Sequence, residues 1–388
     1  MSLLSRRSRT SVTVAAVGVA AFAAGAIVGG VGTAPAAAPA GVLDEAAARI
    51  EQQAARPVDR TDLERAAVEG MLKALGDRWS AYYSPSEFTS FNDKLEGRFT
   101  GVGVWVRQSS SGALLVSSVQ SGSPAARGGL RAGDEVVSVD GHQVANQPVS
   151  TVLGWLRGAN GSTVQVGLHR SSGALVVALR RSEVTTQDVT VDRLAGQVLH
   201  IRVSAFTRGV GRQVRAAVTV DPSAAKHGIV LDLRDNPGGL VDEAVEVASV
   251  FLDGGPVVTY EQRGKPSQTL DALGHGDTTT PLVVLVDGST ASAAEIVAAA
   301  LQDRNRAVVI GSRTFGKGSV QEPATLSDGS ALELTVGRYT TPSGRSIDGV
   351  GVEPDLLVPD DAPPAAAESR ALDVLAGLLA AVSSEGRG

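Results

Sequence analysis

The feature that most constrains the fold is an alternation of apolar strands and helices that starts near Gln187. Three segments read as strands, VLHIRVSAF, GIVLDLR and PLVVLVDG, and each is followed by a helical segment, GRQVRAAVTV, GGLVDEAVEVASVFL or ASAAEIVAAALQD. The strands are apolar at successive positions, so both of their faces must be covered. The pattern therefore predicts a sheet with helices packed on it.

Other regions flank this predicted core. Short strands separated by turn residues, with two helical pieces in SPAARGGL and VSTVLGWLRG, predict a small β-barrel-like module before it. An earlier region reads as helical, because apolar residues recur there at helical spacing. The predicted boundaries are 1–33 for an export segment, 34–42 for a Pro/Ala linker, 43–97 for the N-terminal helical region, 98–182 for the module, 183–360 for the core and 361–388 for a C-terminal tail with a helix.

The N-terminal sequence has the pattern of an export segment. Arg6, Arg7 and Arg9 precede a mostly Ala, Val and Gly run, and no further charge occurs before Asp44. A cationic start followed by an apolar run is typical of an export signal. The run is long enough to span about 30 Å of hydrocarbon, and the small residues of APAAAPA offer cleavage sites. A retained membrane anchor and a cleaved signal both stay open, and either predicts an extracytoplasmic protein, secreted or anchored to the cell membrane.

Composition excludes several kinds of chemistry. The net charge is −6 and no long Lys or Arg run follows the first residues, so a nucleic-acid partner is not expected. The chain has 0 cysteines, which excludes disulfides, thiol catalysis and thiolate metal sites. The histidines are scattered outside any recognised motif, and each is expected to have a structural role or to lie at the surface: His142, His169, His200, His227 and His275.

One stretch, GSRTFGKGSV at 311–320, is close to a phosphate-binding loop. The pattern G-x-x-x-x-G-K-[ST] needs a hydroxyl residue after the lysine, and Gly318 follows Lys317. A phosphate loop also needs a helix directly after its lysine. The residues that follow read instead as a hairpin, with an SDG turn between alternating segments. The sequence therefore disfavours nucleotide binding, and a solvated turn lysine remains the plain alternative.

A serine upstream gives this lysine a second interpretation. Ser292 lies where the strand PLVVLV turns into a helix, and first-turn amides such as that of Ala293 have no helical partner. Such amides can stabilise an oxyanion. A second source of amides is the turn Pro237-Gly238-Gly239 in LDLRDNPGGL, where glycines allow close approach of a ligand. A helix cap and a simple turn are the plainer readings of the two segments taken singly.

Several segments together resemble the carboxyl-terminal processing proteases, which are serine peptidases with a Ser–Lys pair. They are GMLKALGDRWSAYYSPSEF, GRFTGVGV, DLRDNPGGL, STASAAEIVAAALQD, IGSRTFGKGSVQ, LSDGSALELTVGRYTTPSGRSI and GVGVEPD. The resemblance covers roughly residues 42–360 in the family's order. It implies an α/β multidomain fold: an α/β sheet-plus-helices protease core (crotonase/ClpP-like), an inserted or preceding PDZ domain and an N-terminal helical region.

The resemblance also implies roles for individual residues. Ser292 matches the nucleophile, Lys317 the general base and Gln321 a glutamine that helps to hold the base. Gly238, with Gly239, and the backbone of Ala293 match the oxyanion hole. Ala294 stands where the family often has a second serine, which affects no catalytic position.

The residue types suit that chemistry. A serine hydroxyl needs a neighbouring base, and a lysine serves only when neutral, with its pKa lowered from about 10.4 to roughly 7–8. Apolar burial lowers it in this way, and Thr314-Phe315 is a candidate apolar neighbour. We expect Gly318 to belong to a tight turn that directs Lys317 toward the serine. Asp232 and Asp235 are expected to shape their turn rather than act as acid or base.

The module at 98–182 looks like a PDZ domain. Its loop of Gly101, Val102, Gly103 and Val104 would present amides to a peptide C-terminal carboxylate, and the next strand would pair with the peptide. Groove lining and ordinary core packing are both open for Val102, Val104, Leu153 and Leu156. Arg157 is a candidate for coupling the module to the core.

The sequence therefore predicts an exported serine endopeptidase that cleaves proteins near their C-termini by an acyl-enzyme mechanism, with no metal or nucleotide cofactor. Predicted partners are protein substrates bound through C-terminal tails, a regulatory protein, a second copy in a homodimer, and the membrane while the N-terminal segment is uncleaved. A catalytically silent PDZ scaffold is the alternative. A nucleotide-binding protein would depend on the near-match at 311–318 alone.

Overall fold

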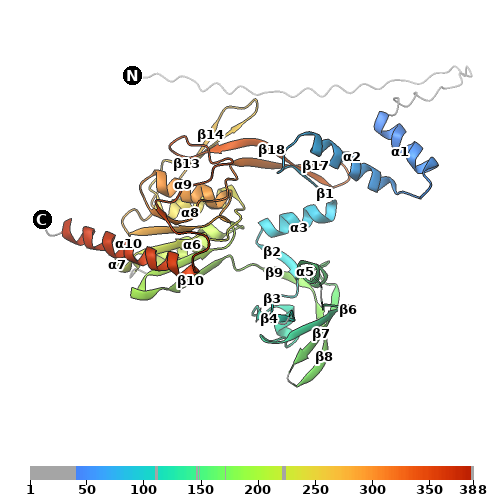
Figure 1. Cartoon of the computed structure of the whole chain (residues 1–388), viewed down its shortest axis with the longest axis horizontal. Coiled ribbons are helices and arrows are strands. Elements are labelled where there is room, and N and C mark those ends of the chain that lie inside the picture. Colours follow the sequence, from blue (N-terminus) through green and yellow to red (C-terminus); the bar gives the residue numbers. More distant parts are fainter. Residues whose placement is uncertain are drawn as a thin grey trace, which may run out of the picture. The chain divides into compact units, whose positions relative to one another are not determined.

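The computed structural model describes residues 41–109, 112–145, 147, 149–170, 172–220 and 224–385 (Figure 1). The predicted export segment at 1–33 lies outside these residues, and so does nearly all of the linker at 34–42. The chain divides into two compact units, Met1–Glu64 and Arg65–Gly388. The described part of the first unit holds helix α1 (Val42–Gln53) and the start of α2 (Arg60–Ala74). In it, Arg60 donates to Asp44 at 2.6 Å.

The second unit begins with the remainder of α2, strand β1 (Ala81–Tyr83) and helix α3 (Pro85–Leu95). Helix α3 starts where the sequence favours a start. The Ser84 hydroxyl accepts from the Glu87 amide while the Glu87 carboxylate accepts from the Ser84 amide, and a proline occupies the first turn. This reciprocal cap satisfies two amides that the helix itself leaves without acceptors.

The module has its own sheet and core. The strands are β2 (Arg98–Gly101), β3 (Val104–Gln108), β4 (Leu114–Val119), β5 (Glu135–Val139), β6 (His142–Gln143), β7 (Thr163–Arg170), β8 (Gly173–Arg180) and β9 (Ser182–Thr185), with helices α4 (Pro124–Arg127) and α5 (Val149–Leu156). The main sheet runs β3-β4-β5-β7-β8 with β6 on β5, and β2 pairs with β9. Apolar side chains from both helices and this sheet form one buried cluster.

The predicted core sheet is present and mostly parallel. Its order is β10 (Val189–Arg193), β11 (Leu199–Val203), β12 (Ile229–Asp232), β15 (Leu282–Val286), β16 (Val308–Gly311) and β19 (Leu356–Leu357). Only β10 is antiparallel to its neighbour among these pairs. A 3₁₀ turn (Ala195–Gln197) joins β10 to β11.

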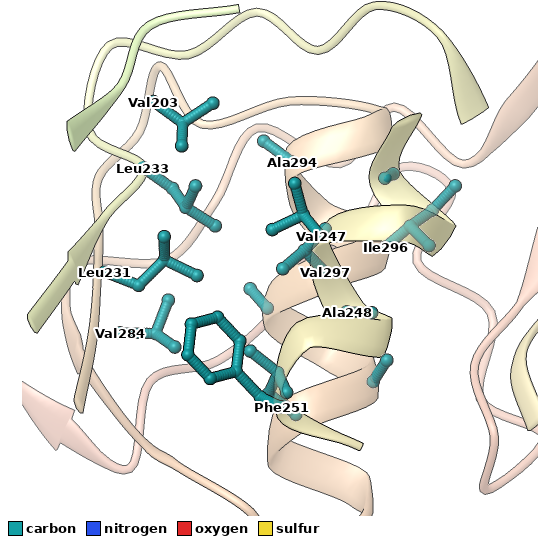
Figure 2. Close-up of a cluster of buried hydrophobic side chains, with 14 of the residues drawn as sticks. Val203, Leu231, Leu233, Val247, Ala248, Phe251, Val284, Ala294, Ile296 and Val297 are labelled. Carbon is teal, nitrogen blue, oxygen red and sulfur yellow. The ribbon is translucent and has the colours of Figure 1, made fainter. Parts of the chain in front are cut away.

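Helices cover both faces of this sheet, as the apolar strands require. Leu231 and Val284 pack on one face with helices α6 (Val210–Val220), α8 (Val241–Phe251) and α9 (Ala293–Asp303), and Figure 2 shows them facing Phe251 and Val297. Their neighbours Val230 and Val283 point to the other face, where helix α10 (Pro364–Glu385) packs. The short helix α7 (Ala224–His227) contacts α10. Successive residues of each strand therefore pack into the hydrophobic clusters on opposite faces of the sheet.

A second sheet carries the segment after Lys317. Strands β17 (Ser319–Thr325) and β18 (Ala331–Thr340) form an antiparallel hairpin, and β18 also pairs with β1 and with β13 (Pro256–Gln262), which pairs with β14 (Gln268–Asp271). The predicted hairpin is confirmed. No helix N-terminus follows Lys317 in this described segment, so the phosphate-loop reading has no structural basis.

Candidate active site

Ser292 lies at the carboxyl end of β15, immediately before α9. Its backbone has φ 56° and ψ −117°, a conformation that non-glycine residues adopt only when the surrounding structure enforces it. Strand β15 before it is buried throughout, and helix α9 after it is buried from Ala293 to Leu301. The side chain itself is half-buried, so a strained turn presents the hydroxyl at the edge of the sheet.

Glu295 links the serine to the lysine. Its carboxylate is fully buried and accepts from the backbone amides of Ser292, Lys317 and Gly316, each at 2.8 Å. It also accepts from the Thr314 hydroxyl. A buried carboxylate is tolerable only with such a set of donors. One side chain in the first turn of α9 therefore fixes the backbone on both sides of the site. Sequence reasoning missed this role, although a glutamate in the first turn after a serine is a capping signature.

The loop that carries Lys317 is shaped by its two glycines in different ways. Gly316 adopts φ +85°, a region that favours glycine. Gly318 needs close approach instead, because a Cβ there would lie 2.4 Å from the backbone nitrogen of Asp348. Gly318 was expected to belong to a tight turn that directs Lys317 toward the serine, but no turn is formed at 317–319. Gly316 is the residue with a left-handed backbone conformation, and the missing side chain of Gly318 lets the loop pack against the backbone of Asp348.

The amine of Lys317 lies over an aromatic ring. Its Nζ is 4.7 Å from the centroid of the Trp79 ring, within the range of a cation–π contact. Burial lowers the pKa of Lys317, and the carboxylates of Glu333 and Asp77 oppose that shift. Across the described residues, no hydrogen bond joins the lysine amine to the Ser292 hydroxyl.

The contact between Trp79 and Lys317 was not predicted from the sequence. The expected apolar neighbours of the lysine were Thr314 and Phe315, but the Thr314 hydroxyl is bound to Glu295 and Phe315 is 50% exposed. Phe315 instead packs edge-on against Trp79, with ring centroids 5.9 Å apart. Trp79 and Lys317 lie far apart in the sequence, so no local pattern could have paired them.

Gly238 lies directly beside the serine. A Cβ on Gly238 would be 2.9 Å from Ser292 Cβ and 3.0 Å from the Ala293 nitrogen, and its φ is +101°. Gly239, with φ +141°, packs on the backbone of Phe206. The structure therefore brings the PGG turn and the start of α9 together, and neither glycine could carry a side chain without displacing backbone.

The amides of this turn are not equally available. The Gly238 amide donates to the side chain of Asn236 at 2.8 Å, and the fully buried Asn236 donates in turn to the carbonyl of Val203. The Ala293 amide is in the first turn of α9, where it has no helical acceptor. In this conformation Ala293 is the better placed of these two amides for an oxyanion.

The two aspartates shape the turn after β12. Asp232 is fully buried, and its carboxylate accepts several hydrogen bonds. The Arg234 backbone amide donates to it at 3.0 Å and the Arg234 guanidinium at 2.7 and 2.9 Å. The His200 ring lies 3.3 Å from it. Burial alone would raise the pKa of Asp232, but the donors from His200 and Arg234 hold it well below its usual range. Asp235 has φ +59° and pairs with Arg202 at 3.0 Å.

Gln321 lies on β17, where its amide donates to Ser319 at 2.7 Å and to Thr335 at 3.2 Å. Within the described structure it makes no hydrogen bond to Lys317. The predicted glutamine is thus close to the base in sequence, and its side chain is held by neighbours on the hairpin.

A cavity of about 450 Å³ lies beside the Gly101–Val104 loop. Leu153 and Leu156 of α5 and Arg157, which directly follows that helix, line the cavity, together with core residues at 186–188 and 204, 205 and 207. Val102 and Leu156 are also 2% and 4% exposed members of the module's core, so they both pack and line the cavity. Gly103 has φ +75°, and a Cβ there would overlap Ser123.

Two broader features concern the described residues as a whole. Among them, no group of three or more His, Cys, Asp or Glu side chains is arranged to hold a metal ion. None of the described helices is long and apolar enough to cross a membrane.

Comparison with known sequences agrees with this geometry. Residues 197–358 match peptidase family S41 and residues 115–170 match the PDZ domain. A carboxy-terminal-processing protease of Bartonella bacilliformis is 35% identical over 323 residues, 81% of this chain and 74% of that protein. A probable CtpA-like serine protease of Staphylococcus aureus is 34% identical over 304 residues, which cover 77% of this chain but only 61% of that protein.

Solved structures show the same arrangement. A photosystem II D1 C-terminal processing protease, 31% identical, superposes with a TM-score of 0.52 over 83% of this chain and 93% of its own. A putative S41 protease from Bacteroides fragilis, 18% identical, shares the fold with a TM-score of 0.53 over 89% of this chain and 100% of its own. The fold and the site define a serine-peptidase core preceded by a PDZ domain. The chain belongs to peptidase family S41, which confirms the predicted family and fold class.

Proposed function

We propose that the protein is an exported serine endopeptidase that cleaves proteins near their C-termini through a Ser292–Lys317 pair. The observation that carries the proposal is the buried Glu295 carboxylate, which binds the backbone amides of both residues at 2.8 Å. The meeting of Gly238 and Ala293 with the same serine supports the proposal further, because it brings candidate amide donors beside the proposed nucleophile.

In the proposed reaction, neutral Lys317 accepts the proton of the Ser292 hydroxyl as its oxygen attacks the peptide carbonyl. The Ala293 amide stabilises the oxyanion, joined by an amide of the Gly238-Gly239 turn. Lys317 then protonates the leaving amine, and the acyl-enzyme forms. In the second half, Lys317 takes a proton from the water that attacks the acyl carbon. It returns this proton to the Ser292 oxygen as the acyl bond breaks, which restores the hydroxyl and the neutral amine. Gln321 is proposed to help hold the base during these steps.

Substrate tails are proposed to dock in the cavity beside the Gly101–Val104 loop. The loop and β3 offer amides for a terminal carboxylate and for strand addition, and Leu153 and Leu156 offer an apolar wall. We further propose an extracytoplasmic location, because a basic start and an apolar run precede residue 44. A regulatory protein and a second copy of the chain remain proposed partners.

The test is digestion of casein, an unfolded substrate, with product masses determined for wild type and Ser292→Ala. The proposal predicts C-terminally shortened products from the wild type and none from the variant. Shortened products from folded Ser292→Ala would refute the proposed nucleophile. Binding of C-terminal tail peptides by a wild type that cleaves nothing would favour the PDZ scaffold instead.

A further inference from the structure

The backbone at Trp79 is held beside Lys317 by hydrogen bonds. Its backbone amide donates to Asp77 at 3.0 Å, and Ser80 donates to the other oxygen of that carboxylate. Ser80 in turn accepts from the backbone of Thr335, and the adjoining strand β1 pairs with β18. The backbone that carries the ring is therefore tied to the sheet of the lysine hairpin by contacts that do not involve Lys317.

The contact between the ring and the lysine has a definite charge preference. An aromatic face attracts an ammonium ion through its quadrupole and offers no such attraction to a neutral amine. The Lys317 Nζ is 4.7 Å from the ring centroid, and Arg78 lies over the same ring at 4.5 Å. The conformation in the structure is thus one that suits the protonated lysine.

The charged groups around the amine come from several elements. The carboxylates of Asp77, before the ring, and Glu333, on β18, attract the ammonium. Glu333 also accepts from the Tyr83 hydroxyl at 2.7 Å, and Glu295 on α9 holds the lysine's backbone. The Arg78 guanidinium is the opposing cation. Glu295 is the one group here that belongs to the serine turn, and its contact is with the backbone of Lys317. The two carboxylates that attract the ammonium itself, Asp77 and Glu333, lie on the Trp79 side of the lysine.

We propose that Trp79 is a positioning residue for Lys317, whose ring retains the ammonium form apart from Ser292 and releases the amine to the serine when the proton is lost. This inference rests on the proposed function of Lys317 as the base. It makes Trp79 a residue that sets the pH at which the pair becomes active, without touching substrate.

The first test is the pH profile of casein cleavage by Trp79→Leu, with Trp79→Phe as the conservative variant. Leucine keeps apolar cover but removes the ring, so the protonated lysine loses stabilisation and its pKa falls. The half-maximal pH on the rising limb should move down by about half a unit to one unit in Trp79→Leu, and by less in Trp79→Phe. Trp155→Phe, which changes a tryptophan packed on the core of the PDZ module, should leave the half-maximal pH of the rising limb unchanged. An unmoved limb in folded Trp79→Leu overturns the inference.

The second test needs no catalysis and keeps Trp79. The chain has 3 tryptophans, so Trp105→Phe with Trp155→Phe leaves Trp79 as the sole reporter. Its fluorescence is followed between about pH 6 and pH 11. The inference predicts a titration step in the fluorescence of the protein that keeps Lys317, and it predicts that Lys317→Met abolishes this step. The inference is contradicted if the protein with Lys317 shows no step, or if Lys317→Met retains it. If that step is present while casein stays intact, the proposed function fails and the contact with Trp79 stands.

Discussion

At the scale of single residues, the site is organised by Glu295 as much as by the reacting pair. Replacing it with glutamine keeps the shape but puts an NH₂ group against a backbone N–H. Because buried donors would then lack acceptors, we expect Glu295→Gln to lose about 2–4 kcal/mol of unfolding free energy. Casein cleavage should fall by roughly 100-fold or more, since misplacement of a catalytic group by about 1 Å is that costly.

The matched control is Glu353→Gln, which changes an exposed carboxylate paired with Arg313. A surface ion pair contributes about 0–1 kcal/mol, so urea unfolding and cleavage should both stay near wild type. Full activity in Glu295→Gln would show that this carboxylate does not position the pair.

The residues that the sequence predicted are those with a local signature. Ser292 stands at a strand-to-helix junction and Gly238 in a PGG turn, and the structure brings them together. Trp79 and Asn236 carry no such signature. Their importance arises from contacts made after the chain has folded, with a lysine far along the sequence in one case and a strand carbonyl in the other.

At the scale of elements, the PGG turn depends on the absence of a side chain at Gly238. Alanine there would need an unfavourable φ and would also bring a methyl group within 3.0 Å of both Ser292 and Ala293. We expect Gly238→Ala to lose about 1–3 kcal/mol of unfolding free energy. Cleavage should become nearly undetectable, because the serine turn must move to admit the methyl group.

Gly254→Ala is the control that separates the cost of backbone strain from the cost of a steric clash with Ser292. Gly254 has φ +70°, and a Cβ at this position would have nothing within 4 Å, so its variant bears the backbone strain alone. It should lose comparable stability in urea unfolding while retaining wild-type cleavage per folded molecule. Equal activity loss in both variants would mean that the contact with Ser292 is unimportant.

The pairing of β11 with β12 carries a pH-dependent contribution. Burial opposes protonation of His200, but the carboxylates of Asp232 and Asp192 raise its pKa overall. A raised folded-state pKa stabilises the fold fully below the unfolded value of about 6.5, and that contribution is lost as pH rises through the folded value. Wild type should therefore lose unfolding free energy over that window relative to His200→Gln. Parallel pH dependence of the two proteins in urea unfolding would contradict this.

The order of the elements was largely predictable, and their pairing was not. Mostly apolar runs identified β11, β12 and β15 with the helices after them, because a strand buried on both faces is rich in apolar residues. The hairpin after Lys317 was signalled by its SDG turn. That β18 would also pair with β1, which brings Trp79 to the lysine, depends on contacts between distant segments and leaves no trace in either segment alone.

At the scale of the whole molecule, the tail cavity and the peptidase site share a backbone segment. Ser204 and Thr207 line the cavity. Phe206, between them, donates to the Gly238 carbonyl and accepts from Leu240, both at 2.8 Å. A tail bound in the cavity would therefore contact the segment that supports the oxyanion turn.

This arrangement predicts that tail recognition affects turnover. Substrate with an amidated C-terminus should be cleaved at least about 10-fold more slowly than substrate with a free one, since the loop amides would face a neutral group. Arg157, which lines the cavity and lies over the Phe99 ring at 6.0 Å, should contribute to this difference. Identical rates for both tails, or an unchanged ratio in Arg157→Ala, would argue against the coupling.

The central claim is that Lys317 is the base for Ser292, and the most direct measurement is the initial rate of casein cleavage by Lys317→Ala beside Lys265→Ala. Lys265 is an exposed lysine between β13 and β14, so its variant controls for the loss of a positive charge. With both variants shown to be folded, we expect wild-type cleavage from Lys265→Ala and none from Lys317→Ala. Cleavage that persists in Lys317→Ala would contradict the Ser–Lys mechanism.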